Sequence, residues 1–141
     1  MTDPAAATSA GRAVVRVLLG VALAGAGVTH LTTAREEFRA QVPEFVPLDA
    51  DTTVLASGVV EIALGSALVL GRKRVGVGWV VAAFFVAVFP GNLAQWVHHR
   101  DGFGLDTDTK RFVRLFFQPV LVVAALWSTG AWRAYRQRRR S

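Results

Sequence analysis

Among the polar and charged side chains within the long apolar stretches of this 141-residue chain, six are of types that allow hydrogen bonding and proton exchange at a binding site. Glutamate offers a carboxyl group and arginine a permanent positive charge, while histidine gains or loses a proton near neutral pH. Amide side chains both donate and accept hydrogen bonds. The six residues are His30, Glu61, Asn92, Gln95, Arg114 and Gln118.

Helical spacing groups these residues on shared faces. Glu61 lies four residues after Ser57 and four before Gly65, so all three face one side of a helix. Arg114 and Gln118 are also four residues apart. The remaining pairs with helical spacing are Asn92 with Gln95 and Ala26 with His30. We therefore expect four helices to turn their polar faces toward one another around a pocket.

Glu61 is the most informative single residue, because a charged group at the centre of a membrane helix costs about 2.5–3.5 kcal/mol or more. Its side chain must be protonated, paired or in contact with water. Arg114 is the expected charge partner, and His30 is the second candidate. Glu61 either serves ligand binding and proton transfer, or it anchors two helices by hydrogen bonds without any chemistry.

The sequence contains no cysteine, which removes several kinds of site. Disulfides, thiolate zinc sites, iron–sulfur clusters and covalently attached haem all require cysteine. Any redox chemistry must therefore belong to a bound cofactor or to a partner protein. A zinc or haem site that combines His30 and Glu61 with His98 or His99 is the weaker alternative, because adjacent histidines on a helix point about 100° apart. We predict no metal.

Four apolar segments must position these groups, at residues 14–31, 53–70, 75–97 and 112–132. Their lengths are close to the roughly 20 helical residues that cross a hydrocarbon core of about 30 Å. Only 18% of the residues are charged, against about 25% in an average soluble domain. The sequence therefore predicts an all-α, integral membrane four-helix bundle over residues 12–133. A disordered tail is expected at residues 1–11 and a basic cytoplasmic tail at residues 134–141.

The charged residues between the segments predict an orientation. Ten of the sixteen basic residues lie in three clusters, namely Arg12 with Arg16, Arg72–Arg74, and five arginines within 133–140. Four alternating helices place all three clusters on one side, while the opposite connections, residues 34–52 and 98–111, carry net charges of −3 and zero. The positive-inside rule then places both termini in the cytoplasm and the polar side chains in the outer half of the membrane. The basic charge thus indicates orientation rather than nucleic-acid binding.

Two further segments bear on the pocket. The connection at residues 34–52 contains Pro43, Pro47 and several apolar residues, so it is expected to lie on the outer face of the bilayer or to fold over the mouth of the bundle. The run Phe89–Asn92 contains a proline followed by a glycine and is expected to interrupt the third helix. Such an interruption is tolerated beside a cavity, which favours a pocket next to Asn92.

Four motifs resemble the DoxX-like family of small four-helix bacterial membrane proteins. They are residues 27–31 (GVTHL), the pair Pro43 and Pro47, residues 57–65 (SGVVEIALG), and residues 89–92 (FPGN) followed by His98. The similarity covers about residues 12–132 and implies a multi-pass protein of the bacterial inner (cytoplasmic) membrane. Some DoxX relatives are associated with quinone-linked redox or sulfur metabolism. Thiol-based relatives depend on cysteines that this chain lacks, so thiol–disulfide exchange is excluded.

We therefore expect a polar pocket in the outer half that binds a quinone or another lipophilic molecule in a redox-associated subunit. The pocket is predicted to be formed by His30, Glu61, Asn92, Gln95, Arg114 and Gln118, and no catalytic residue is assigned. One alternative is a scaffold or accessory protein whose polar residues only hold the helices together, and another is an oligomeric transporter. The expected partners are the lipid bilayer and another membrane protein or a second copy, and not nucleic acid.

Overall fold

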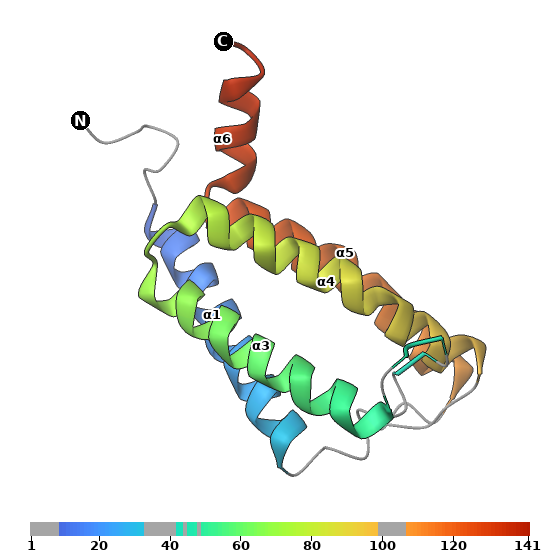
Figure 1. Ribbon diagram of the computed structural model, residues 1–141. Coiled ribbons are helices and arrows are strands. Elements are labelled where there is room, and N and C mark those ends of the chain that lie inside the picture. The colour runs from blue at the N-terminus through green and yellow to red at the C-terminus, as the bar shows by residue number, and fades with distance from the viewer. Residues whose placement is uncertain (1–8, 33–41, 44, 48, 99–106) are drawn as a thin grey trace.

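The computed structural model describes residues 9–32, 42–43, 45–47, 49–98 and 107–141, and all regular elements in these ranges are helices. They are α1 (Ala10–Leu31), α3 (Ala50–Leu70), α4 (Arg74–Val97), α5 (Asp108–Ser128) and the short α6 (Ala131–Arg138). Figure 1 shows two antiparallel pairs, α1 with α3 and α4 with α5, which lie against each other at one end. The all-α prediction is confirmed for the described residues.

The two ends of the bundle differ in their connections. At one end, called the turn end here, α3 and α4 are joined by a tight turn in which Gly71 and Lys73 have φ values of 71° and 49°. The start of α1, the end of α5 and all of α6 lie at the same end (Figure 1). At the opposite loop end, α1 ends at Leu31 and α5 begins at Asp108.

The long helices begin before the apolar segments that predicted them, because their N-caps lie in polar sequence. Ser9, Asp49 and Thr107 each accept a hydrogen bond from the backbone N–H three residues later. The expected disordered tail lies outside the described residues up to residue 8. Its last residues, Ala10 and Gly11, belong to α1.

The fourth apolar segment is shorter than predicted. The expected helix at residues 112–132 ends at Ser128, and α6 follows after Gly130, whose φ is 76°. A positive φ is open to glycine at little cost and terminates a helix. The chain therefore bends by 70° between the two helices. Residues 134–138 of the segment expected as a basic tail belong to α6.

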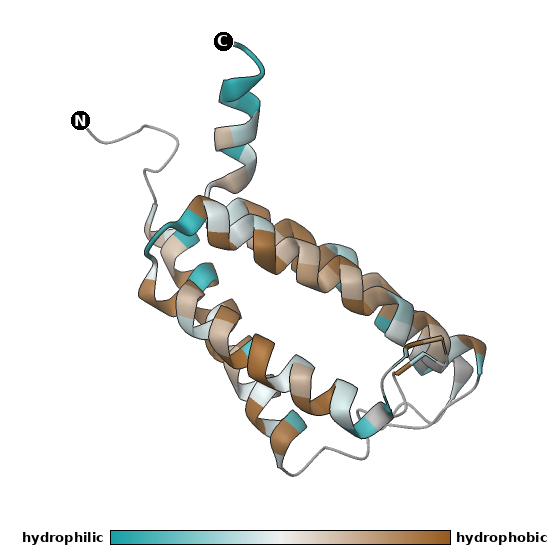
Figure 2. Ribbon diagram, in the orientation of Figure 1, coloured by the Kyte–Doolittle hydropathy of each residue, from teal (hydrophilic) through white to brown (hydrophobic). Residues whose placement is uncertain are grey.

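Three helices are long and apolar enough to cross a membrane, namely Ala10–Leu31, Asp51–Leu70 and Arg74–Gly91. A fourth is counted when Phe112–Ser128 and the bent α6 are taken as one span. Apolar residues cover the long helices, whereas polar residues gather at α6 and at the α3–α4 turn (Figure 2).

The expected interruption at Phe89–Asn92 is wrong, because α4 continues through Pro90 to Val97. Proline lacks one backbone N–H, so its ring removes a single hydrogen bond to the preceding turn. The rest of the helical hydrogen bonding is retained on both sides.

Glycines bring α1 and α3 into backbone contact. A Cβ atom added to Gly65 would lie 2.5 Å from the Gly20 carbonyl oxygen, and one added to Gly27 would lie 2.5 Å from the Gly58 carbonyl oxygen. Real side chains do not tolerate such distances, so each position requires glycine for the helices to approach. Gly20, Ala24 and Gly27 of α1 therefore face α3.

The turn end contains the packed core. Its buried side chains come from all four long helices and are Leu19, Leu23, Leu68, Val81, Ala82, Phe85 and Ala125. Arg16 is also buried and donates to the carbonyl oxygens of Leu68 and Val69 at the end of α3. Arginine at this position satisfies carbonyl groups that lack partners within the helix. The sequence pattern placed Arg16 only in a basic flank.

Candidate functional site

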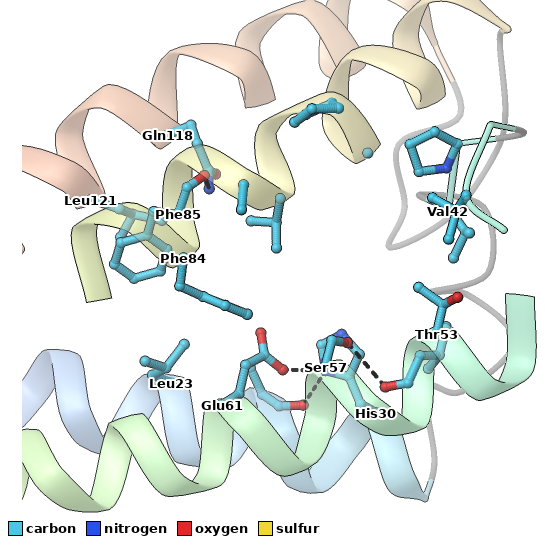
Figure 3. Close-up of a pocket in the computed structure, with 18 of the residues that line it drawn as sticks. Leu23, His30, Val42, Thr53, Ser57, Glu61, Phe84, Phe85, Gln118 and Leu121 are labelled. Carbon is cyan, nitrogen blue, oxygen red and sulfur yellow. Dashed lines mark hydrogen bonds and ion pairs between the residues drawn. The ribbon is translucent and has the colours of Figure 1, made fainter. Parts of the chain in front are cut away.

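A cavity of about 370 Å³ separates the two helix pairs toward the loop end. All four long helices contribute to its lining, together with Val42, Pro43, Phe45 and Val46 of the first long connection. In Figure 3, Glu61, Ser57 and His30 lie on the α1–α3 side, while Phe85, Gln118 and Leu121 lie on the α4–α5 side. The cavity is thus mostly apolar, with a small number of polar groups placed on opposite walls.

The α1–α3 wall contains a buried His–Glu pair. The Nδ1 atom of His30 lies 2.7 Å from Glu61 Oε2 and also 2.7 Å from the Ala26 carbonyl oxygen. The two residues are only 6% and 8% exposed, and both line the cavity. Glu61 Oε2 is therefore held by the imidazole and is buried. The other oxygen of the Glu61 carboxylate points toward the cavity in Figure 3.

The expected partner of Glu61 was wrong. Arg114 donates instead to Gln118 Oε1 on its own helix, at 3.3 Å, and His30 takes the place beside Glu61. The reason is the glycine contact between α1 and α3, since a Cβ atom on Gly58 would lie 2.8 Å from His30 Cβ. This close approach brings the imidazole to the carboxylate one turn further along α3.

The α4–α5 wall is fixed by Gln118. Its side chain is 3% exposed, and Nε2 donates to the Phe85 carbonyl oxygen at 2.6 Å. The amide oxygen accepts from Arg114, so the side chain links α5 to α4 and also holds the guanidinium. Because an unpaired amide in an apolar site is costly, this pairing defines how the wall is assembled.

Four of the six predicted pocket residues therefore line one cavity, and they are His30, Glu61, Arg114 and Gln118. Asn92 and Gln95 lie in the last two turns of α4, and their side chains fall outside the described part of the structure. From that region, Pro90 and Gly91 line the cavity.

The lining also includes residues that the sequence pattern did not assign to the pocket. Phe84 and Phe85 both line the cavity, at the level of Glu61 and Gln118 (Figure 3). Ser57 lines it as well, and its position one turn before Glu61 was the available signal. Val42 and Pro43 of the first long connection also line the cavity, and Val42 lies at its end in Figure 3. This position agrees with the expectation that the segment folds over the mouth of the bundle.

Metal ligands do not gather in the described parts of the chain, where no three histidine, aspartate or glutamate side chains come together. The chemistry available at the cavity is hydrogen bonding and proton exchange. An ionised Glu61 accepts a hydrogen bond from a hydroxyl group, and a protonated Glu61 donates one to a carbonyl group.

Comparison with known proteins gives one match. No curated protein and no solved structure matches the chain. Residues 19–129, which include all four long apolar segments at least in part, match the model of a family described as a domain of unknown function, DUF8561. The chain therefore belongs to the DUF8561 family.

Proposed function

We propose that the chain is a four-pass protein of the bacterial inner membrane, similar to the DoxX-like bundles, with both termini in the cytoplasm. Three apolar helices have the required length and composition, and α5 is taken as the fourth pass, with the bent α6 at its cytoplasmic end. The turn end carries the exposed Arg72 and Lys73 together with the basic α6, which suits the cytoplasmic side. The cavity then lies in the outer half of the membrane.

The cavity is proposed to bind a lipophilic molecule with a carbonyl or hydroxyl head group, such as a quinone. The observation that carries this proposal is the buried His30–Glu61 pair on the wall of a mostly apolar cavity, with one carboxylate oxygen held by His30 and the other turned toward the cavity (Figure 3). Ligand pockets are typically about 300–1,000 Å³ and mostly apolar with a few directed polar groups. A cavity of about 370 Å³ is within that range and suits a single ring system.

Each polar residue has a distinct part in this proposal. Glu61 exchanges a hydrogen bond, and a proton, with the head group of the ligand. His30 holds the carboxylate in place and shares its charge, because a carboxylate beside hydrocarbon needs a partner. On the opposite wall, Arg114, which is positioned by Gln118, attracts a carbonyl oxygen of the ligand. A bound quinone would supply the electron transfer, which makes a redox-associated subunit the natural context.

A scaffold without a ligand is the second candidate, and the hydrogen bond from Gln118 to Phe85 favours it. This bond links two helices and needs no ligand. In a pure scaffold, the His30–Glu61 pair would do the same for α1 and α3.

The two candidates are distinguished by ligand titration of the purified protein in lipid nanodiscs. Short-chain benzoquinones and naphthoquinones are the probes, and the variants are Glu61→Gln and His30→Ala. Val123→Ala is the matched control, because Val123 is 65% exposed on the outer face of α5 and does not line the cavity.

Binding by the wild type and the control, with affinity about tenfold weaker in Glu61→Gln, supports the proposal. Glu61→Gln keeps a side chain that can hydrogen-bond but removes the charge, and a hydrogen bond to a charged group contributes about 1.5–3 kcal/mol against about 0.5–1.5 kcal/mol for a neutral one, a difference that corresponds to about tenfold in affinity. Equal binding by all four proteins, or no quinone binding by any of them, would refute it. A loss of folding in Glu61→Gln with no quinone bound by the wild type would support the scaffold instead.

A further inference from the structure

The short helix α6 does not continue the direction of α5. It bends by 70° from α5 after Gly130 and projects away from the bundle at the turn end in Figure 1. If α5 crosses a membrane, a helix at this angle lies close to the plane of the membrane surface. The geometry thus resembles that of helices that rest in the interfacial layer.

The side chains of α6 combine exposed aromatic rings with arginines around them. Trp132 and Tyr135 are three residues apart and share one side, called the aromatic face here, with Ala131, which is buried against the bundle. Arg139 lies over the Tyr135 ring, 5.8 Å from its centroid, and Arg136 is exposed further round the helix. Such a combination suits a membrane surface, because arginine keeps its charge in the head-group layer while its stem lies along apolar groups.

Ring contacts join the aromatic face of α6 to Trp79 near the start of α4. The rings of Trp79 and Tyr135 are 5.9 Å apart, and those of Trp132 and Tyr135 are 5.7 Å apart. Trp132 and Tyr135 remain 48% and 40% exposed, so the cluster also presents apolar area outward. Tryptophan and tyrosine are enriched where hydrocarbon meets water, because their rings are apolar and their edges polar.

The charge around α6 is of one sign. No aspartate or glutamate occurs after Asp108, whereas the last nine residues contain five arginines. Arg72 and Lys73 add exposed positive charge from the turn between α3 and α4 at the same end of the bundle. A surface of this charge is complementary to anionic phospholipid head groups.

We propose that α6 is a lipid-binding helix that docks on an anionic phospholipid surface, with Trp132 and Tyr135 in the interfacial layer and Arg136 and Arg140 on the phosphate groups. The occupant is the head-group layer of the same membrane that holds the bundle. This role is separate from the cavity, which lies toward the other end of the helices. A failure of quinone binding would therefore leave it intact.

Site-directed spin labelling tests the docking directly, because the chain contains no native cysteine. Single cysteines at Trp132→Cys and at Gln137→Cys place one label on each face of α6, in the full chain in vesicles containing phosphatidylglycerol. We expect oxygen, which concentrates in hydrocarbon, to relax the label at position 132. A water-soluble nickel complex should relax the label at position 137. Equal exposure of both labels to the nickel complex would overturn the proposal.

The dependence on charge gives the second readout. Each basic residue near an anionic surface contributes about fivefold to binding, so the double variant Arg136→Gln/Arg140→Gln should lower the docking equilibrium constant about 25-fold. The matched control Arg136→Lys/Arg140→Lys keeps the charge and should dock as the wild type does. In vesicles of phosphatidylcholine alone, the wild type should dock weakly. Wild-type docking that is as strong on phosphatidylcholine as on phosphatidylglycerol would contradict binding to anionic lipid. A loss of docking in the lysine variant as large as in the glutamine variant would contradict it as well.

Discussion

The two ends of the bundle use the same four helices in opposite ways. At the turn end, Leu68 and Val81 are almost completely buried, and Arg16 satisfies the last carbonyl groups of α3. Toward the loop end, the helix pairs diverge and leave a cavity of about 370 Å³ with Glu61 and Gln118 on facing walls. One end of each helix thus contributes to a packed core, and the other end borders an open cavity, where the proposed ligand would bind.

This division predicts that substitutions at the two ends have different consequences. Added volume should be harmful at the turn end and tolerated at the cavity. Lost volume should reduce stability at the turn end with little effect on ligand binding.

The largest effect is expected for Gly65→Ala. The new Cβ atom would lie 2.5 Å from both the Ala24 nitrogen and the Gly20 oxygen, which are backbone atoms that cannot rotate away. Overpacking typically costs about 1–3 kcal/mol, and we expect about 3 kcal/mol here, measured as thermal unfolding in detergent.

The matched control is Gly25→Ala, because nothing lies within 4 Å of a Cβ atom on Gly25. Alanine is the better helix former, so this variant should be neutral or more stable by up to about 1 kcal/mol. Similar behaviour of the two glycine variants would contradict the close contact of α1 with α3.

A smaller loss of stability is expected for Leu68→Ala, whose side chain is 1% exposed in the core of the turn end. We expect about 2 kcal/mol, the low end of the range for a buried leucine, since lipid is as apolar as the core and only the packing is lost. Quinone affinity should remain within twofold of the wild type. A large drop in affinity in folded protein would show that the two ends are not independent.

Filling the cavity should affect binding and leave folding unchanged. Ser57 lines the cavity, and its hydroxyl donates to the Val54 carbonyl oxygen of its own helix, so Ser57→Phe removes no hydrogen bond between helices. We expect quinone affinity to fall at least tenfold while the unfolding temperature stays within a few degrees of the wild type. Wild-type affinity in Ser57→Phe would place the ligand elsewhere.

The smallest effect is expected at the N-cap of α3. Hydrogen bonds from the hydroxyl and the backbone N–H of Thr52 hold the pKa of Asp49 below its usual value of 3.8. Because the folded-state pKa is the lower one, this stabilisation is complete above pH 3.8 and is lost as the pH falls through the folded-state value. The wild type should exceed Asp49→Asn slightly in stability at neutral pH, with the gap closing under acid. A stability difference that widens under acid would contradict a lowered pKa of Asp49 in the folded protein.

The sequence predicted the fold and part of the site, because both depend on local patterns. Apolar segments of membrane length predicted the four long helices, and polar residues at helical spacing identified His30, Glu61, Arg114 and Gln118 for one pocket. Helix ends were less accurate, since Ser9 and Asp49 act as caps within polar sequence.

The pairing within the site was not predictable from charge alone. Arg114 was the expected partner of Glu61, but which side chains meet depends on which helices touch. The glycines of α1 and α3 set that contact, and they bring His30 to Glu61. The bend at Gly130 was missed because the apolar residues Ala131 and Trp132 continue the preceding segment without a break in composition.

Photoaffinity labelling with a short-chain azidoquinone tests the central claim most directly, because it locates the ligand in the folded protein in nanodiscs. We predict adducts on cavity residues such as Ser57, Phe84 and Val88, and their loss when excess unlabelled quinone is present. Adducts confined to the exposed face of α5, for example at Phe116 and Val123, would contradict a ligand site between the helix pairs.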